Sequence, residues 1–387
     1  MRIFISTGEV SGDLQGALLV EALYKQAQHR GLDLEIVALG GDRMAEAGAE
    51  IIANTAQIGS IGLFESIPFV LPTLQAQKRA RQVFRKQPPD VLVLIDYHDP
   101  NIALARVARK QLPNLPIFYY IAPQSWVWAP TLRSTQEIVT LTDRILAIFP
   151  QEADFFREQG ANVQWVGHPI VDRMQQAPSR EEARQRFGFT PEQKVVTLLP
   201  ASRWQEIKFL LPPMLEAAQH LQEKIPDLQF LLPLSLNIYE GKIGEILAKY
   251  DLNLKVLQNQ TLDAIAASDL AITKSGTVNL EIALLQVPQV VIYRLHWFTM
   301  WLARTFFRFS IPFMSPTNLV LMREIVPELL QEEATSERIV QESLDFLLND
   351  QRRAKVVQDY QEMTAALGGV GACERAAENI LGEFNRE

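Results

Sequence analysis

The chain has 387 residues, of which 48% are hydrophobic and 21% are charged. This composition is typical of a globular protein, and the length suits two α/β domains better than one core. The formal net charge of -8 argues against a nucleic-acid-binding protein, which is usually basic. Cys373 is the single cysteine, so a disulfide framework and a cysteine-rich metal site are excluded, as expected for a reducing cytoplasm.

The start of the chain, residues 2–6, has a strand-like pattern and lacks the long apolar run of a signal peptide. No apolar stretch reaches roughly 18 residues without a charge or a proline. We therefore expect neither a signal peptide nor a membrane-spanning helix.

Short runs rich in Val, Ile and Leu alternate with longer amphipathic stretches, which is typical of a parallel sheet covered by helices. In the first half, strands are expected near 2–7, 34–39, 91–96, 117–122, 144–149 and 163–167. In the second half, they are expected near 194–200, 228–234, 254–258, 270–274 and 289–294. Helical patterns are expected to dominate from about residue 322 to the end.

A polar segment at 175–192 separates the two series of strands, and we interpret it as a linker or boundary helix. We expect one domain over 1–175, a second over 176–355, and C-terminal helices over 356–387 that pack back on the first domain or on a partner subunit. The predicted fold is α/β, with two Rossmann-like doubly wound domains facing each other across a cleft. Ligands of such sheets bind at the carboxyl ends of the strands.

The first candidate site follows the first expected strand and opens a helix; its residues are Gly8, Glu9, Val10, Ser11, Gly12 and Asp13. Glycines permit a tight turn and close approach of a ligand, and a helix N-terminus offers free amides. The spacing differs from GxGxxG, so a dinucleotide site is not indicated. The structural alternative is a βα turn in which Ser11 or Asp13 caps the helix.

The second candidate site lies at the end of the strand expected near 91–95. A carboxylate at this position is suited to act as a general base toward a sugar hydroxyl. We assign that role to Asp96 and expect Asp99 to cap the following helix; the alternative is that Asp96 caps it. Two aspartates could hold a divalent cation, but no other ligands cluster with them in the sequence, so we predict no metal and no cofactor.

A third candidate site, Ser202-Arg203, follows the first expected strand of the second domain. A guanidinium there could neutralise a nucleoside diphosphate leaving group through two parallel hydrogen bonds. The alternative is an ion pair between Arg203 and Glu206.

The fourth candidate site joins an apolar strand to a helix through Ser275, Gly276 and Thr277. Backbone amides and two hydroxyls in this arrangement could hold a diphosphate. Glu281, one turn into the helix, could accept hydrogen bonds from ribose hydroxyls. The alternative is an ordinary N-capped helix with Glu281 on its surface.

Two apolar stretches suggest contact with a membrane surface. Residues 61–76 are unusually apolar and precede a basic run of Lys78, Arg79, Arg81, Arg85 and Lys86. An apolar segment beside basic residues can hold an anionic lipid surface. The second stretch is rich in aromatic residues and runs over 296–309. The alternative for both is core packing or a subunit interface.

These motifs together resemble those of the lipid-A-disaccharide synthases, and the matching pieces run in order through nearly the whole chain. They are GEVSGD at 8–13, IDYHDPN at 95–101, APQSWVWA at 122–129, VGHPIVDRM at 166–174, PASR at 200–203, SGTVNLE at 275–281, VVIYR at 290–294 and SPTNLV at 315–320.

The resemblance implies an inverting glycosyltransferase of the GT-B architecture. It implies that UDP-2,3-diacylglucosamine and 2,3-diacylglucosamine 1-phosphate are joined by a β-1,6 link with release of UDP. The place of reaction would be the cytoplasm, at the inner face of the inner membrane, with a peripheral enzyme that forms a homodimer. The residues implied are Asp96, Arg203 and Asn318 for catalysis, Ser202, Ser275, Gly276, Thr277 and Glu281 for UDP, and the turn Gly8, Glu9, Ser11, Gly12 and Asp13 for the acceptor side.

The chain departs from the family pattern at Ala201, Ala129 and Thr317, where Gly, Arg and Pro are usual. Two alternatives stay open: a UDP-sugar 2-epimerase, which has the same two-domain architecture, and a lipid- or nucleotide-binding relative without turnover, which the departures at Ala201 and Ala129 leave possible. A dinucleotide oxidoreductase is not indicated, because no nicotinamide fingerprint is present.

Overall fold

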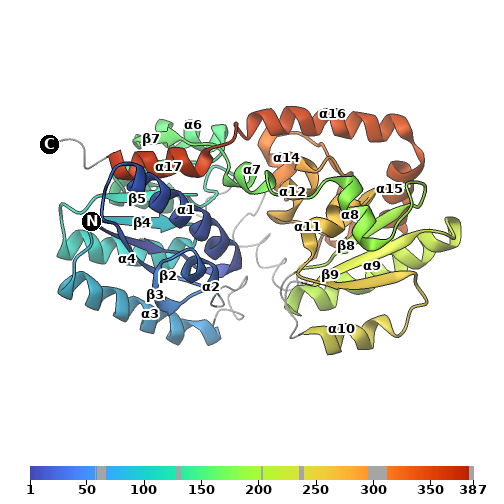
Figure 1. Cartoon of the computed structure of the whole chain (residues 1–387), viewed down its shortest axis with the longest axis horizontal. Helices are drawn as coiled ribbons and strands as arrows, with labels where there is room; N and C mark the ends of the chain where they lie inside the picture. Colours follow the sequence, from blue (N-terminus) through green and yellow to red (C-terminus); the bar gives the residue numbers. More distant parts are fainter. Residues whose placement is uncertain are drawn as a thin grey trace. The chain divides into compact units, whose positions relative to one another are not determined.

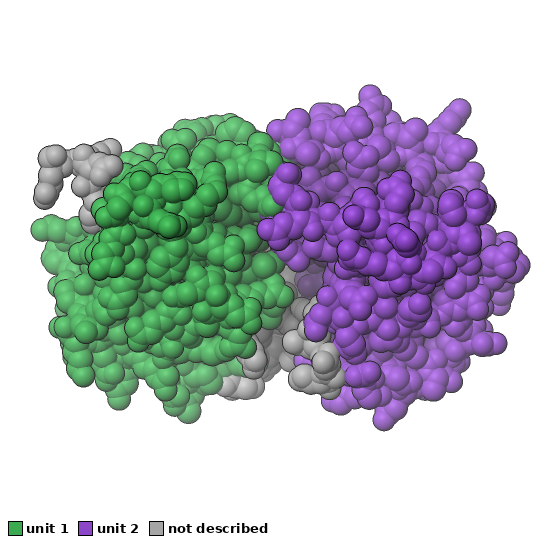
Figure 2. Space-filling model, in the orientation of Figure 1, with its two compact units in different colours: residues 1–172, 367–387 green, residues 173–366 purple. Residues whose placement is uncertain are grey.

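The computed structural model describes residues 1–56, 58, 67–127, 132–201, 204–234, 239–294 and 312–382. The chain forms two compact units, drawn in different colours in Figure 2. Unit 1 comprises residues 1–172 and 367–387, and unit 2 comprises residues 173–366. The chain therefore enters unit 2 once and returns to unit 1 for its last helix.

Unit 1 is built on a parallel sheet with the order β3-β2-β1-β4-β5-β6-β7. The strands are β1 (Arg2–Ser6), β2 (Glu35–Gly40), β3 (Glu50–Asn54), β4 (Val91–Ile95), β5 (Ile117–Tyr120), β6 (Arg144–Ala147) and β7 (Val163–Trp165). The chain starts in the middle, builds one half outward and then returns to build the other. Because crossovers are right-handed, the two halves place their helices on opposite faces.

The helices of unit 1 are α1 (Glu9–His29), α2 (Asp42–Glu46), α3 (Ile67–Lys86), α4 (His98–Gln111), α5 (Leu132–Leu141), α6 (Pro150–Glu158) and α17 (Ala372–Leu381), and α7 (Pro169–Met174) spans the boundary. Ala80 and Phe84 of α3 and Ile102 of α4 pack with Phe4 and Tyr119 in one buried cluster. Helices α1 and α17 lie side by side although the sequence separates them widely (Figure 1).

Unit 2 contains a second parallel sheet, with the order β10-β9-β8-β11-β12-β13. Its strands are β8 (Val195–Leu199), β9 (Gln229–Leu234), β10 (Leu254–Gln258), β11 (Leu270–Lys274), β12 (Gln289–Tyr293) and β13 (Glu328–Leu330). Its helices are α8 (Arg180–Phe187), α9 (Trp204–Lys224), α10 (Glu240–Leu247), α11 (Thr261–Ala267), α12 (Val278–Leu284), α14 (Pro316–Leu321), α15 (Ser336–Leu348) and α16 (Asp350–Ala366). Helix α8 packs with α11, and α9 packs with α15. The predicted class, α/β with two doubly wound sheets, is confirmed.

The segment at 175–192 contains α8, which is anchored to the sheet of unit 2. Arg180 Nη2 lies 2.9 Å from Asp269 Oδ1, and Arg184 Nη1 donates to Ala267 O at 2.9 Å. Val195 N, at the start of β8, donates to Asp269 Oδ2 at 2.9 Å. The buried Asp269 thus ties this helix to the first strand of the unit.

Two strands differ from the sequence-based expectation. The strand β3 was not expected from the sequence, because its residues Glu50–Asn54 are half-buried or exposed at the sheet edge and contain an apolar run of only three residues. Helices dominate after residue 322 as expected, but the short strand β13, Glu328–Leu330, was not predicted and pairs with β12. Such short edge strands are defined by their neighbours more than by their own residues.

None of the helices in the described part of the chain combines the length and apolar character needed to cross a bilayer.

Candidate functional site

The carboxyl ends of β1, β4 and β5 have an unusual backbone conformation. Of the eight non-glycine residues with positive φ in the described part of the chain, four lie here: Glu9, Asp96, Tyr97 and Ile121. Left-handed conformations are disfavoured for residues with a Cβ, and they cluster where the surrounding structure holds a functional geometry. This edge of the sheet is therefore the candidate site of unit 1.

Asp96 follows directly after β4, and its N–H donates to Ile121 O at 3.0 Å. Its side chain is open to solvent on one side and crowded by protein on the others. Loss of surrounding water, together with the charge of Glu9, raises the pKa of Asp96 to about 6; a hydrogen bond from the Tyr97 backbone and the nearby His98 oppose the shift. A carboxylate with this pKa is ionised at neutral pH and still basic enough to accept a proton.

Close packing explains two glycines in the first turn. A Cβ on Gly8 would lie 2.6 Å from ring atoms of Tyr97, and a Cβ on Gly12 would lie 2.1 Å from Thr7 Oγ1. The turn after β1 is thereby pressed against the turn after β4. Both turns were expected from the sequence as separate sites, and their contact was not expected.

Asp13 has a structural environment. Its carboxylate is buried and accepts hydrogen bonds from the N–H groups of Gly41 (2.7 Å), Arg43 (3.2 Å) and Met44 (3.2 Å). These groups lie at the start of α2, so Asp13 caps a helix other than its own. The alternative in which Ser11 or Asp13 caps α1 is wrong, because the N-cap residue is Gly8.

The capping role expected for Asp99 is also wrong. Helix α4 begins at His98, its N-cap is Tyr97, and no side chain caps it. The side chain of Asp99 is 95% exposed and contacts His98 Nδ1 at 2.7 Å. Neither aspartate of this turn therefore serves as a cap, which removes the structural alternative for Asp96.

Glu152 is a buried carboxylate near the same edge that the sequence analysis missed. It accepts hydrogen bonds from Ile148 N (2.8 Å), Phe149 N (3.2 Å) and Ala122 N (3.2 Å). Burial raises the pKa of Glu152 to about 7, although the three N–H groups oppose the shift. Its position at the third residue of α6 identifies it as the capping residue that joins the segments after β5 and β6.

In unit 2, the loop after β11 is held by its own polar groups. Ser275 Oγ donates to Met314 O at 2.6 Å, and Gly276 N donates to Asn279 Oδ1 at 2.7 Å. Asn279 is fully buried and also donates to Lys274 O at 3.2 Å. The loop is therefore pre-formed, and the N–H of Gly276 is already committed to Asn279.

Two ion pairs flank this loop. Glu281 is buried and pairs with Arg173, so the alternative that places Glu281 on the surface is wrong. Glu206, which was the alternative partner of Arg203, lies 2.8 Å from Lys274 Nζ through its Oε1 atom. Ser202 and Arg203 themselves lie outside the described residues.

Asn318 is fully buried, and its amide group is engaged on all sides. Its nitrogen donates to Val326 O (2.9 Å) and Glu328 Oε1 (2.8 Å), and its oxygen accepts from Ile325 N (2.8 Å) and Val326 N (3.0 Å). These four bonds occupy both N–H groups of the amide nitrogen and both lone pairs of the amide oxygen. Asn318 therefore holds its own segment and has no atom to offer a substrate in this conformation.

Thr317, where the resemblance led us to expect proline, is buried. Thr317 Oγ1 donates to Asn279 O at 3.1 Å, so it links α14 to the start of α12. Ala129 lies outside the described residues.

The predicted membrane-facing segment is described only in part. Residues 61–66 of the first stretch and the whole second stretch, 296–309, lie outside the described residues. In α3, Val70, Leu71 and Leu74 are 53%, 65% and 59% exposed. The basic residues Lys78, Arg79, Arg81, Arg85 and Lys86 of the same helix are also exposed. The described part of the predicted membrane-facing surface thus has exposed apolar side chains at the start of α3 and exposed basic side chains further along the same helix.

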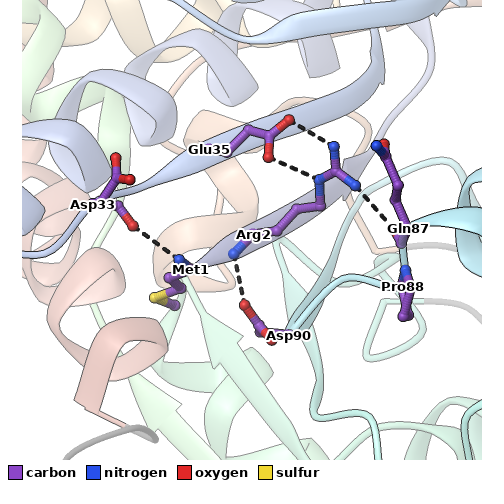
Figure 3. Close-up of a pocket in the computed structure, with 7 residues that line it drawn as sticks. All are labelled: Met1, Arg2, Asp33, Glu35, Gln87, Pro88 and Asp90. Atoms are coloured by element: carbon purple, nitrogen blue, oxygen red, sulfur yellow. Dashed lines mark hydrogen bonds and ion pairs between the residues drawn. The ribbon is translucent and has the colours of Figure 1, made fainter.

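A pocket of about 370 Å³ lies elsewhere, at the amino ends of β1 and β2 (Figure 3). Its polar groups are already paired with one another. Arg2 forms two hydrogen bonds with Glu35, at 3.0 and 2.7 Å, and the Arg2 N–H donates to Asp90 Oδ2 at 2.7 Å. Because ligands of doubly wound sheets bind at the carboxyl edge, we do not assign a function to this pocket. Among the described residues, no group of three or more side chains could hold a metal ion.

Comparison with known proteins identifies the family. The model of the lipid-A-disaccharide synthetase family matches residues 3–381. The chain is a member of this family. It is 58% identical over 381 residues to the lipid-A-disaccharide synthase of Gloeothece citriformis, which covers 98% of this chain and 99% of the relative. The Synechocystis sp. enzyme of the same name is 57% identical over 383 residues, covering 98% of this chain and 97% of the relative.

Membership in the lipid-A-disaccharide synthetase family makes the protein an enzyme, a hexosyltransferase of lipid A biosynthesis. Neither the epimerase alternative nor the non-catalytic alternative is favoured by these matches. The family assignment rests on identity along the whole chain, including the segments that the structure leaves undescribed.

Solved structures show the same fold at low identity. The putative UDP-N-acetylglucosamine 2-epimerase of Listeria monocytogenes has a TM-score of 0.69 at 15% identity, covering 100% of this chain and 97% of the other. The Neisseria meningitidis UDP-GlcNAc 2-epimerase, solved with UDP-GlcNAc, has a TM-score of 0.68 at 12% identity, covering 99% of this chain and all of the other. These matches confirm the expected GT-B type of fold.

The capping role of Asp13 can be tested by stability. Replacement of Asp13 by Asn turns a hydrogen-bond donor toward one of the three N–H groups and should lower the free energy of unfolding by about 1–3 kcal/mol. Urea titration measures this change. Asp42→Asn, in the first turn of the same helix, serves as the matched control and should change stability by less than about 0.5 kcal/mol. Unchanged stability together with weaker acceptor binding would instead indicate a substrate contact for Asp13.

Proposed function

We propose that this hexosyltransferase transfers a 2,3-diacylglucosaminyl group from UDP to the 6-hydroxyl of 2,3-diacylglucosamine 1-phosphate. Asp96 takes the proton of that hydroxyl while its oxygen attacks the donor C1 atom from the face opposite UDP. The bond between C1 and the diphosphate oxygen breaks, and UDP leaves with the electron pair. The configuration at C1 inverts, which gives the β-1,6 link.

The observation that carries this proposal is the environment of Asp96. It is accessible, it lies at the carboxyl end of a parallel strand, and its pKa is raised to about 6. The turn at Gly8, Glu9, Ser11 and Gly12 touches the same edge through Tyr97 and forms the acceptor side. Asp13 contributes by fixing α2 beside that turn.

The donor nucleotide is assigned to unit 2. In the sequence, Ser202 and Arg203 follow β8, and Ser275, Gly276, Thr277 and Glu281 follow β11; the strands β8 and β11 are hydrogen-bonded neighbours in the sheet. The Gly276 N–H already donates to Asn279. We therefore assign the diphosphate contacts of this loop to Thr277 and to the backbone N–H of the next residue. Arg203 supplies the positive charge that stabilises UDP as it leaves.

Two residues of the donor side act indirectly in this proposal. Arg173 holds the carboxylate of Glu281, which accepts hydrogen bonds from the ribose. Asn318 holds Glu328, whose carboxylate accepts from Met314 N (2.7 Å) and Ser315 N (2.9 Å) and so fixes the carbonyl that Ser275 contacts. Asn318 is thus a positioning residue for the UDP loop.

We further propose that the enzyme works as a peripheral protein at the cytoplasmic face of the inner membrane, as a homodimer. Both substrates carry acyl chains that must leave the lipid phase at least in part. The exposed Val70, Leu71 and Leu74 offer apolar contact, and the basic residues that follow in α3 attract anionic headgroups.

The reaction is tested directly by incubation with UDP-2,3-diacylglucosamine and 2,3-diacylglucosamine 1-phosphate in detergent. UDP release and a disaccharide 1-phosphate of the expected mass should appear together. Conversion of a soluble UDP-sugar to its 2-epimer would support the epimerase alternative, and binding without turnover would support the non-catalytic one.

Asp96→Asn should lower kcat by roughly 10²–10⁴-fold, because the amide cannot accept the proton. UDP binding and thermal stability should stay close to those of the wild-type enzyme, since the carboxylate side chain is accessible and UDP is assigned to unit 2. UDP release measures kcat, and titration calorimetry measures UDP affinity. Wild-type kcat in the variant would remove Asp96 from this role.

The pH profile offers an independent test. The base acts when ionised, so kcat/KM should be low below pH 6, rise through an inflection at about 6, and level off above it. Glu9→Gln removes a negative charge that raises the pKa of Asp96 and should move the inflection to lower pH. Asp99→Asn is the control, since that side chain points into solvent. An inflection that Glu9→Gln leaves in place would contradict the assignment.

A further inference from the structure

The carbonyl oxygen of Asp96 accepts two side-chain hydrogen bonds. Asn101 Nδ2 donates to it at 2.7 Å, and Tyr119 OH donates to it at 2.8 Å. The N–H of Asp96 is also paired, with Ile121 O. Both main-chain polar groups of Asp96 are therefore held by neighbouring elements, and only its side-chain torsions remain to be set.

Asn101 is fully buried, and its orientation is fixed. Its amide nitrogen faces the carbonyl oxygens of Ile95 (3.0 Å) and Asp96, which can only accept. Its amide oxygen accepts from the hydroxyl of Ser6, at 2.7 Å. One side chain of α4 thus connects the end of β1 to the end of β4.

Tyr119 provides the second donor from β5, and its side chain is also fully buried. Burial raises the pKa of Tyr119, and the charge of Asp96 adds to the shift. The hydroxyl therefore keeps its proton and remains a donor at any pH at which the enzyme is active. The next residue, Tyr120, points to the opposite face of the sheet, where its hydroxyl lies 3.9 Å from Cys373 Sγ.

The conformation held by these bonds is one that the chain would not adopt alone. Asp96 has a φ of 46° and Tyr97 a φ of 51°, so two non-glycine residues in succession are left-handed. Such residues persist where the surroundings over-determine them. A glycine would relieve the strain at position 96, but it could not supply a carboxylate.

We propose that Asn101 and Tyr119 form a clamp that fixes the direction in which the Asp96 carboxylate faces the acceptor hydroxyl. The clamp rests on the proposed function, because it accounts for a base that must be held in place. Both are positioning residues, since they act through Asp96. A misplacement of about 1 Å can cost roughly 100-fold in rate, so a fixed main chain at the base has a direct catalytic value.

Tyr119→Phe is the main test, because it removes one hydroxyl and keeps the buried ring. We expect kcat to fall on the order of tenfold, with the KM for the UDP-sugar unchanged. The inflection of kcat/KM should move below pH 6, because a carboxylate that leaves its crowded position regains water. Tyr120→Phe, the matched control on the same strand, should keep the wild-type kcat and pH profile.

A double variant distinguishes positioning from general damage. Tyr119→Phe should cause no further loss when combined with Asp96→Asn, because the clamp acts through the carboxylate. The same fractional loss in both backgrounds would overturn the clamp. Wild-type kcat and pH profile in Tyr119→Phe would overturn it as well.

Crystal structures of Tyr119→Phe and Asn101→Ala test the clamp without any assay of turnover. Asp96 should leave the left-handed region or shift its carboxylate in at least one variant. An unchanged Asp96 in both would overturn the clamp while leaving the proposed reaction standing. Conversely, a wild-type enzyme that releases no UDP from the two lipid sugars would overturn the proposed reaction, and the crystal structures would still decide the clamp.

Discussion

The hydrogen bonds that meet at the Asp96 carbonyl are the contact on which the site of unit 1 depends. In a parallel sheet, the ladder ends where the strands end, so nothing in the sheet itself fixes the residues that follow. Here Ser6 of β1 holds Asn101, Asn101 holds the end of β4, and Tyr119 of β5 holds the same carbonyl. Three strand ends are thereby joined into one rigid edge. These hydrogen bonds hold Asp96 at its positive φ, and that backbone conformation in turn sets the direction of the carboxylate in the proposed clamp.

Environment, and not residue type, separates the aspartates of this unit. Asp13 is buried and accepts three N–H groups, which makes it part of the fold. Asp99 points into solvent, and Asp96 is accessible but crowded enough for its pKa to rise to about 6. The buried Glu152, with a pKa raised to about 7, is engaged by three N–H groups like Asp13. Of these four carboxylates, Asp96 alone combines a raised pKa with access for a substrate.

The sequence predicted the fold class, nearly all strands and the turn that carries Asp96, because apolar runs and turn residues are local signals. It did not predict β3 or β13, whose pairing is decided by neighbouring strands. Residue types alone also suggested capping for Asp99 and, as the alternative to a ribose contact, a surface position for Glu281, and the structure shows neither capping by Asp99 nor an exposed Glu281. Asn101 lies within the motif at 95–101, but no role was predicted for it. Its contacts with Ser6 and Asp96 join different strands, and residue spacing in the sequence does not reveal such contacts. Burial and long-range hydrogen bonds were the missing information.

The second unit uses a different device for the same purpose. Its loop after β11 is held from a distance, by a series of contacts from Asn318 to Glu328, from Glu328 to Met314, and from Met314 to Ser275. The charge of a diphosphate is spread over several oxygens. We therefore expect its binding to depend on the shape of the whole loop more than on the exact position of one atom. A proton acceptor, in contrast, must be placed to within a fraction of an ångström. Disturbance of the Asn318 series should therefore appear mainly in the KM of the UDP-sugar, whereas disturbance of the edge around Asp96 should appear in kcat. In the proposed mechanism, unit 2 binds the leaving group and unit 1 activates the nucleophile, and a buried amide side chain, Asn318 or Asn101, keeps each part in place.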